Sequence, residues 1–407
     1  MKNRYLFLFA SSLISLFCIN DSANANSKAA TEPSVLLLSI DGFRWDYIEK
    51  HQATHIAKIA KQGVRAKQLI PVYPTKTFPN HLSIITGLLP VNHGIVDNKF
   101  CDKKRNECYK MADGGQDSSW LSGVPLWNLA TLQGVKSATY FWPESDALFN
   151  GLKPDYYYHY SKHSDYQARI DQMIFWLNLP LAQRPRFIAG YFSLVDTQGH
   201  EFGPDANETF LAVQKVDKLI GQLAQRLASE VSHPVTLILV SDHGMAAIEP
   251  SKSIAISSLG ISEADFIIKN SGTRVQLYQK PDSQLDLTQV SLHLQERAKG
   301  RFEVLTKEQL AQRGYLNSAR IADIIIETTA PSTFSAHGHS DYLGTHGYAY
   351  TSDMAGLFVA QGPMLKQGYE LETASNLDIY PLVAHLLGLQ LLGPIDGSDA
   401  LKKAIVK

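Results

Sequence analysis

The sequence has few cysteines, almost no net charge and, beyond its start, no long apolar run. Its 407 residues include three cysteines, 38 basic and 39 acidic side chains, and the formal net charge is −1. So balanced a charge gives no basic field and argues against a nucleic-acid-binding surface. No internal repeat or low-complexity tract is visible. At 44% hydrophobic residues and this length, the chain can bury a large core.

The first 25 residues have the pattern of a secretory signal peptide. "MKNR" supplies two positive charges, "YLFLFASSLISLFCI" is a short apolar run, and Ala23-Asn24-Ala25 is an A-x-A cleavage signal. The alternative, a retained membrane anchor, is disfavoured because the run is short for a membrane span. We expect cleavage after Ala25, no stable membrane span afterwards, and an exported protein that is periplasmic or secreted.

Two cysteines remain after this cleavage. Cys101 and Cys108 lie close together in the polar stretch "CDKKRNEC", whereas Cys18 leaves with the signal peptide. In an oxidising compartment, we expect the pair to close a small disulfide loop. A zinc site made by these thiols is disfavoured, because exported free thiols oxidise and no further cysteine is present.

Apolar runs and helical patterns alternate along the chain. Buried-strand runs occur at 34–42, 136–142, 186–196, 235–244 and 356–362, and helical patterns at 55–63, 166–178 and 210–230. This alternation predicts an α/β fold with a doubly wound, mainly parallel sheet flanked by helices. Residues 250–335 depart from this alternation: they contain strand-like runs and one helix, a pattern that predicts a small α+β insertion or subdomain. We expect one domain over 26–407 that includes this insertion.

Metal-capable side chains follow several of the predicted strands. They are Asp41, the spaced pair Asp196 and His200 in "VDTQGHEFGP", the adjacent pair Asp242 and His243 in "SDHGM", and His346 in "GTHGY". In open α/β sheets, sites form beyond the carboxyl ends of the strands. Three carboxylates and three imidazoles suit zinc or a similar transition metal better than calcium. Six ligands exceed what one tetrahedral ion needs, so we expect two metal ions.

Each of these fragments is weak by itself. An Asp-His pair after a strand is more often a polar turn, and Asp196 could cap a helix. His337 and His339 lie in an equally plausible "AHGHSD" and can be read as ordinary loop histidines. The metal prediction therefore depends on the complete set.

The order of motifs resembles the nucleotide pyrophosphatase/phosphodiesterase family of the alkaline phosphatase superfamily. The motifs that carry the resemblance, from about Val35 to Leu365, are "SIDGFRWDY", "PTKTFPNHLSIITGLLPVNHGIVDN", "YFWPESD", "YFSLVDTQGHEFGP", "SDHGM" and "GTHGY…M…FVAQGP". The resemblance implies a single catalytic alkaline phosphatase-like domain. It also implies two Zn²⁺ per chain and a nucleotide or other small phosphodiester as substrate.

Residue by residue, the resemblance assigns roles to ten positions. The threonine of "KTFPNH", Thr77, becomes the nucleophile that forms a phospho-threonine intermediate, which water then releases. One zinc is bound by Asp196, His200 and His346, and the other, which also contacts Thr77, by Asp41, Asp242 and His243. Asn98 matches an asparagine that donates a hydrogen bond to a phosphate oxygen, and Phe78 and Tyr191 match positions that flank the substrate. Asn98 could also be a turn residue, and Tyr191 an ordinary strand residue.

The residues around Thr77 agree with a nucleophile. A threonine hydroxyl needs a base or a metal to become reactive, and Pro79 suits the first turn of a helix, where backbone N–H groups favour a phosphate. The alternatives are that Thr77 is a helix N-cap worth about 1 kcal/mol, or that Thr75 is the nucleophile.

Charge favours a diester substrate. Two zinc ions balance three aspartates and a Thr77 alkoxide, so the centre is neutral and accepts one negative charge easily. The greater charge of a phosphomonoester would call for an additional cation, and the sequence has no arginine near the Thr77 motif, although Lys76 could turn inward.

Two departures from the family pattern leave specificity open. "LVD" stands where relatives often carry "EPD", and "HGYAYTSDM" follows His346 in place of an Asp-Asn-like continuation. The alternatives are a phosphonoacetate hydrolase-like or other two-zinc hydrolase and, from another class, a non-catalytic exported metal-binding protein. A sulfatase is disfavoured, because the C/S-x-P-x-R signature is absent around Thr77.

Overall fold

A large mixed sheet forms the centre of the computed structural model, which describes residues 32–407; the predicted signal peptide, 1–25, lies outside these residues. Across the sheet, the strands are β18 (Tyr369–Ser375), β2 (Val64–Ile70), β17 (Gly356–Gln361), β8 (Val235–Val240), β1 (Ser34–Ile40), β7 (Phe187–Phe192), β5 (Ser137–Tyr140) and β6 (Tyr156–Tyr158). All neighbours in this sheet pair in parallel except β17, which runs antiparallel to both β2 and β8. The predicted doubly wound, mainly parallel sheet is confirmed.

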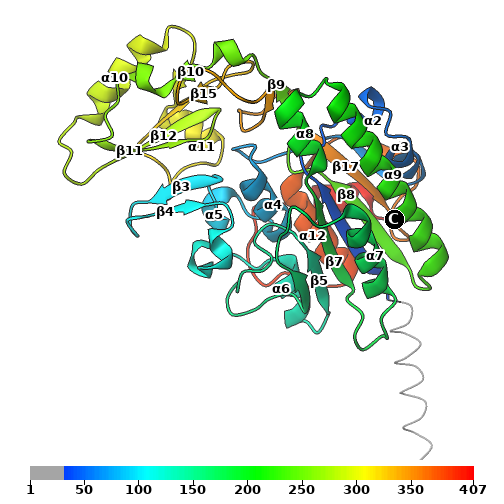
Figure 1. Ribbon diagram of the computed structural model, residues 1–407. Helices are drawn as coiled ribbons and strands as arrows, with labels where there is room; N and C mark the ends of the chain where they lie inside the picture. Colours follow the sequence, from blue (N-terminus) through cyan, green and yellow to red (C-terminus); the bar gives the residue numbers. More distant parts are fainter. Residues whose placement is uncertain (1–31) are drawn as a thin grey trace, which may run out of the picture.

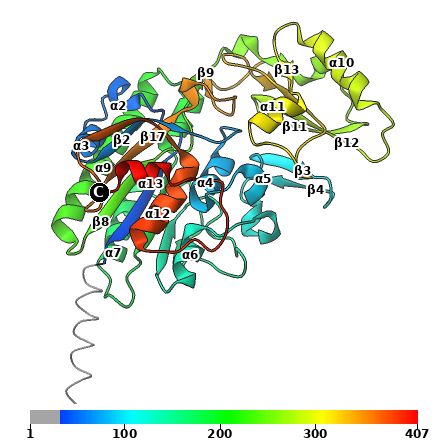
Figure 2. The same cartoon turned by 180° about the vertical axis from the view of Figure 1, so that it is seen from behind.

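Helices cover both faces of this sheet. Alternate residues of β1 point to opposite sides, because side chains in a strand alternate between faces. Leu36 and Leu38 pack in the core with α3 (Thr54–Gln62), α7 (Tyr166–Leu177) and α9 (Asn207–Glu230). Val35 and Leu37 belong to the core on the other face, with α4 (Thr77–Thr86), α6 (Leu126–Leu132) and α12 (Ile379–Leu387). Figures 1 and 2 show the two helical layers from opposite sides.

All five predicted strand runs contain a strand, but one of them holds a helix as well. The run 186–196 forms β7 up to Phe192, and α8 (Leu194–Phe202) begins two residues later. The amino-acid sequence offered no signal for β2, whose "VRAKQLI" mixes charged and apolar residues because several of its side chains are only half-buried. It likewise gave none for β18, most of whose residues are exposed or half-buried. Alternation of apolar residues is a weak signal in such strands.

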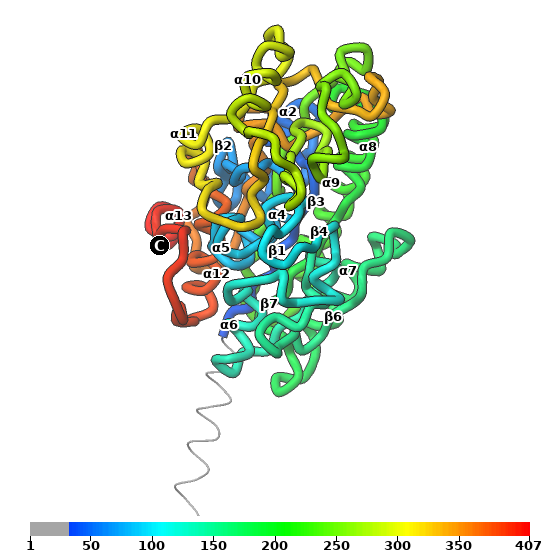
Figure 3. Tube along the Cα trace, turned by 90° about the vertical axis from the view of Figure 1, so that its left-hand side faces the viewer, coloured from blue at the N-terminus to red at the C-terminus, as the bar shows by residue number. Residues whose placement is uncertain are grey.

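Residues 250–335 fold into a small α+β insertion, which extends to the left of the main body in Figure 1 and faces the viewer in Figure 3. Its antiparallel sheet has the order β11 (Phe266–Asn270), β12 (Arg274–Gln279), β14 (Ile324–Glu327) and β13 (Glu303–Val304), with α10 (Leu287–Ala298) and α11 (Lys307–Gln312). Ile324 and Ile326 pack into a small core of its own, whereas Ile325, from the opposite face of β14, belongs to the core of the main body. The insertion is thus continuous with the main core.

A disulfide-closed hairpin lies under this insertion in Figures 1 and 2. It consists of β3 (Lys99–Asp102) and β4 (Glu107–Lys110), and Cys101 and Cys108 form the expected disulfide across it. Lys103 pairs with Asp323 at 2.7 Å, and Arg320 donates to Asp102 at 3.0 Å. These two ion pairs attach the hairpin to the insertion.

Shorter elements complete the structure: α2 (Tyr47–Lys50), α5 (Pro90–His93), β9 (Ala246–Ala247), β10 (Ile254–Ala255), β15 (Phe334–Ser335), β16 (Gly344–Thr345) and α13 (Ala400–Ile405). Within residues 32–407, none of the helices is both long enough and apolar enough to cross a bilayer.

Candidate metal centre

The carboxyl edge of the central sheet gathers the six predicted metal ligands. Asp41 follows β1 directly, and Asp242 comes two residues after the neighbouring strand β8. Asp196 lies in the first turn of α8, which follows β7. Gly42 permits this approach, because its φ is +68° and a Cβ there would lie 2.8 Å from the Cα of Asp196. The turn after β1 thus lets the carboxylates of Asp41 and Asp196, which come from separate elements, lie side by side.

The ligand atoms fall into two adjoining groups. His200 comes one helical turn after Asp196, and its Nε2 lies 3.5 Å from Asp196 Oδ1 and 3.1 Å from His346 Nε2. In the second group, His243 Nε2 lies 2.9 Å from Asp242 Oδ2 and 3.5 Å from Asp41 Oδ1. Ligand atoms of Asp41, Asp242 and His243 all lie within 4.8 Å of one another, and so do those of Asp196, His243 and His346. His243 therefore joins the two groups.

The three imidazoles present the same nitrogen to the centre. His200, His243 and His346 each place Nδ1 at 2.8–2.9 Å from a backbone carbonyl, of Gly344, Gly244 and Thr75 respectively. A carbonyl only accepts, so Nδ1 carries the proton and the Nε2 lone pair faces the cluster. The Nε2 atoms of His200 and His346 would otherwise face each other as two acceptors. A cation between them removes this conflict.

The carboxylates also fit a cation. Asp41 Oδ1, Asp196 Oδ1 and Asp242 Oδ2 are buried and have no hydrogen-bond partner among the described residues. Burial, followed by repulsion from Asp242 and Asp196, raises the pKa of Asp41 well above its usual range. Burial and the charge of Asp196 likewise raise the pKa of Asp242. Three orphaned carboxylate oxygens opposite three imidazole lone pairs make a donor set that could hold metal ions.

Thr77 is the first residue of α4 and points at this cluster. Its Oγ1 lies 3.3 Å from His243 Nε2. Lys76, not Thr77, occupies the N-cap position, so the hydroxyl of Thr77 is not used as a cap. Thr75, the competing candidate, donates its hydroxyl to Tyr348 O at 3.0 Å and accepts from Gly347 N at 2.9 Å. Of the two threonines, only Thr77 directs its hydroxyl toward the candidate metal ligands.

Asn98 lies against the start of the same helix. Its Oδ1 accepts a hydrogen bond of 3.0 Å from the backbone N–H of Phe78. This contact, made by the residue after Thr77, fixes the orientation of the side-chain amide and leaves Nδ2 as its free donor group.

Lys76 turns inward, an orientation that the sequence left open. It is buried and donates to His346 O at 2.8 Å, and burial lowers the pKa of its ammonium group to about 8. An arginine also lies near this motif, contrary to the sequence-based expectation: the Arg274 guanidinium, from the insertion, lies 5.0 Å from the Tyr73 ring. It is paired with the buried Asp97 and therefore adds no net charge.

A cavity of about 430 Å³ opens beside Thr77 and Asp41 and is rich in aromatic side chains. Phe78 and Tyr191 both line it, and the Tyr191 hydroxyl donates to Asp41. Tyr160, which the sequence analysis did not single out, also lines the cavity, and its ring lies 6.3 Å from that of Tyr191. The aromatic run "YYYHY" at 156–160 was the only sequence signal for it.

Glu144 also lines this cavity and is nearly inaccessible to solvent, with 3% of its surface exposed. Burial raises the pKa of its carboxyl from an ordinary 4.5 to about 7. The folded protein keeps this proton over the range in which the unfolded chain releases it, so stability falls as pH rises from 4.5 to about 7.

We expect the Glu144→Gln substitution to remove this pH dependence. Glutamine keeps an acceptor for the Tyr109 hydroxyl, which donates to Glu144. Above about pH 7, the variant should be more stable than the wild type by roughly 1–3 kcal/mol, and near pH 5 the two should differ little. Urea unfolding at both pH values measures this, and a difference that does not change with pH would contradict the assigned pKa.

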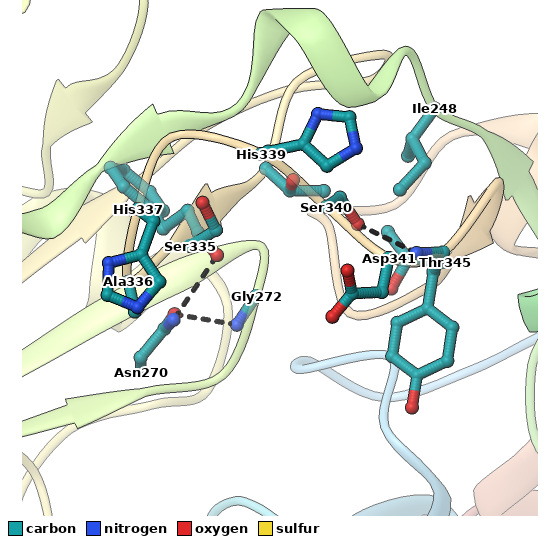
Figure 4. A pocket seen from close by; sticks show the side chains of 13 residues that line it. Ile248, Asn270, Gly272, Ser335, Ala336, His337, His339, Ser340, Asp341 and Thr345 are labelled. Carbon is teal, nitrogen blue, oxygen red and sulfur yellow. Dashed lines mark hydrogen bonds between the residues drawn. The ribbon is translucent and has the colours of Figure 1, made fainter.

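A second pocket, of about 300 Å³, contains the loop histidines His337 and His339 (Figure 4). Their rings lie apart in the close-up, and both side chains are exposed or nearly so. Neither belongs to a potential metal-binding group in the described part of the chain. The structure therefore separates them from the six clustered ligands, although their sequence context looked equally favourable.

The fold and this edge-of-sheet cluster define an alkaline phosphatase-like α/β protein. The family model described as type I phosphodiesterase/nucleotide pyrophosphatase matches residues 35–349, and the chain belongs to this family.

Comparison with individual proteins agrees with this assignment. The chain is 32% identical to a venom phosphodiesterase of Naja atra over 387 residues, 92% of this chain and 46% of that protein. It is 35% identical to human ectonucleotide pyrophosphatase/phosphodiesterase family member 1 over 370 residues, 88% of this chain and 40% of that protein. The chain thus spans less than half the length of these curated relatives. Murine ectonucleotide pyrophosphatase/phosphodiesterase 5, solved as an inactive threonine-to-alanine variant in complex with AMP, superposes with a TM-score of 0.85 at 27% identity, covering 92% of this chain and 100% of that one.

Proposed function

We propose that this protein is a metal-dependent phosphoric diester hydrolase that cleaves phosphodiester or pyrophosphate bonds of nucleotides or related small diesters. The observation that carries the proposal is the position of the Thr77 hydroxyl, 3.3 Å from His243 Nε2 at the edge of the ligand cluster. The names of the relatives, phosphodiesterase and nucleotide pyrophosphatase, and the AMP bound to the murine structure support this substrate class.

Two zinc ions are the proposed cofactors. Asp196, His200 and His346 would hold one, and Asp41, Asp242 and His243, with Thr77, the other. The mixed nitrogen and oxygen donors favour zinc over calcium or magnesium. When bound, two such cations supply Lewis-acid stabilisation of the attacking and leaving oxygens.

The proposed reaction has two displacements at phosphorus. Thr77 Oγ1 first gives up its proton to water and attacks the phosphorus; the bond to the leaving group, an alcohol or a phosphate, breaks, and the departing oxygen takes up a proton from water. A phospho-threonine carrying the retained group results. Water then attacks the phosphorus from the opposite side, gives up a proton, and releases the product while the Thr77 hydroxyl is restored.

The other site residues bind and orient the substrate in this proposal. Asn98 donates from Nδ2 to a non-bridging phosphate oxygen, because its Oδ1 is already bonded to Phe78 N–H. Phe78 and Tyr191 offer aromatic faces to a base or leaving group, joined by Tyr160 across the cavity. The Lys76 ammonium contributes positive charge next to the centre.

Charge supports a diester substrate. Two zinc ions carry +4, three aspartates and a Thr77 alkoxide −4, and the Lys76 ammonium adds +1, so the sum is +1; Arg274 and Asp97 cancel each other. This charge matches the single negative charge of a diester, whereas the second charge of a monoester lacks a partner in this arrangement.

A substrate panel tests the proposal. Purified mature protein is assayed with a nitrophenyl nucleotide ester, nitrophenyl phosphate and phosphonoacetate, before and after chelation. We expect the nucleotide diester to be hydrolysed with the highest kcat/KM, and chelation to abolish turnover until zinc is restored. Phosphate release from phosphonoacetate in preference to diester cleavage, or activity that survives chelation, would overturn it.

We further propose that residues 26–407 are one catalytic domain, with 250–335 as an insertion, and that the chain is exported after removal of residues 1–25. The shared core between insertion and main body supports the first point. Relatives named as venom and ectonucleotide enzymes support export, to the periplasm or the exterior.

A further inference from the structure

The insertion holds the segment that carries Asn98. We call residues 96–99 the Asn98 segment. The Tyr315 hydroxyl, from the loop after α11, donates to the carbonyl of Val96 at 2.8 Å. Gln276, on β12, donates through Nε2 to the carbonyl of Lys99 at 3.2 Å. The two ends of the segment are thus bound by one subdomain that lies more than 150 residues further along the chain.

The side chain of Asp97 connects the insertion directly to the backbone of Asn98. Its Oδ1 accepts the backbone N–H of Asn98 at 2.6 Å. Its Oδ2 accepts from Ser271 Oγ at 2.8 Å, Gln276 Nε2 at 2.9 Å and Arg274 Nε at 3.2 Å, and Arg274 Nη2 donates to the same oxygen. The carboxylate therefore links three side chains of the insertion to the backbone of Asn98.

The ion pair at the centre of this link is shielded from water. The side chains of Arg274 and Asp97 are both 0% exposed. The guanidinium also lies against two neighbouring aromatic rings, 5.0 Å from the centroid of Tyr73 and 5.1 Å from that of Tyr315. A pair in such surroundings is poorly screened by salt, and neither partner can move alone without leaving an uncompensated buried charge.

The link ends at the start of the nucleophile helix. Asn98 Oδ1 accepts from Phe78 N–H, one residue after Thr77. A shift of the Asn98 backbone would break this bond or turn the amide, and the donor Nδ2 would then no longer be held at the start of α4. Misplacement by about 1 Å can cost roughly 100-fold in rate.

Resting on the proposed function, we propose that Arg274 is a positioning residue for the reaction. Through Asp97, it fixes the Asn98 amide at the phosphate-binding position. The insertion thereby completes the substrate site, although none of the six candidate metal ligands belongs to the insertion. The competing interpretation is that the ion pair only fastens the insertion to the main body.

A double-mutant cycle distinguishes the two interpretations. We expect Arg274→Gln to lower kcat/KM for a nitrophenyl nucleotide ester by about 10- to 100-fold, mainly through kcat, with metal content unchanged. In an Asn98→Ala background, the same substitution should change kcat/KM by no more than about twofold, because the group that Arg274 positions is already absent. Equal losses in both backgrounds would overturn the proposal, since a structural role does not depend on the Asn98 side chain.

Control variants distinguish a loss of positioning from a general loosening of the insertion. They also distinguish it from a failure of the proposed function. Lys103→Gln breaks another ion pair between the hairpin and the insertion, and should leave kcat/KM within about twofold of the wild type. If Arg274→Gln does not fold, Gln276→Met removes hydrogen bonds to the same segment without stranding a charge and enters the same cycle with the same expectation. Failure of the proposed function would appear in the wild type, as absent or chelator-resistant diesterase activity, whereas failure of the positioning role appears only in the cycle.

Discussion

Replacing Thr77 by alanine should reduce diester hydrolysis by at least about 10³-fold while leaving the fold and metal content intact. The reason is chemical, because Thr77 Oγ1 is the hydroxyl that faces His243 Nε2, whereas both hydrogen-bonding capacities of Thr75 are used by backbone groups. Stability should change by no more than about 0.5 kcal/mol, since Thr77 makes no helix-capping bond. Steady-state kinetics with bound zinc measured in parallel tests this.

Serine at position 77 is the matched control. It retains a hydroxyl at the start of α4 and should keep measurable turnover, well above that of Thr77→Ala. Turnover by Thr77→Ala at the wild-type rate would show that water, or another group, attacks the phosphorus directly.

Replacing His243 by alanine should cause the second large loss. Its Nε2 contacts Asp41, Asp242 and Thr77 within 3.5 Å, and it belongs to both potential metal-binding groups. We expect bound metal to fall below that of the wild type and activity to fall by at least about 10²- to 10³-fold, because a divalent cation contributes several kcal/mol of charge stabilisation. Metal analysis of the purified variant and its kinetics measure both effects.

His339→Ala is the control for His243→Ala. Both histidines adjoin a glycine and lie near an aspartate in the sequence, but His339 lines a separate pocket and belongs to no metal-binding group in the described residues (Figure 4). Its removal should leave metal content and kcat/KM near the wild-type values. Equal losses of metal and activity in the two variants would mean that the metal ligands have been assigned incorrectly.

Local sequence patterns predicted five of the eight strands of the central sheet and singled out the six side chains that lie together at its edge. The apolar run of β1 and the polar residue after it made Asp41 a candidate, and the four-residue spacing of Asp196 and His200 matches one turn of α8. These signals are local, so a single sequence contains them. The apolar run 186–196 extends beyond β7 because Leu194 and Val195, the first residues of α8, are apolar like the strand residues before them.

Contacts between distant segments could not be predicted in this way. The pairing of Asp97 with Arg274 joins residues 177 positions apart, and neither "VDNKF" nor "TRVQLYQK" indicates the other. The inward orientation of Lys76 depends on the carbonyl of His346, which lies 270 residues later. Tyr160 was missed for a related reason, because an aromatic run gives no information about which ring faces a cavity.

Stereochemistry at phosphorus tests the central claim, two displacements through Thr77, most directly. The measurement is the configuration of the product after hydrolysis of a P-chiral phosphorothioate diester in isotopically labelled water. Each in-line displacement inverts the phosphorus, so attack by Thr77 followed by attack of water predicts net retention. Net inversion would show a single direct attack by water and would contradict the role of Thr77 as the nucleophile.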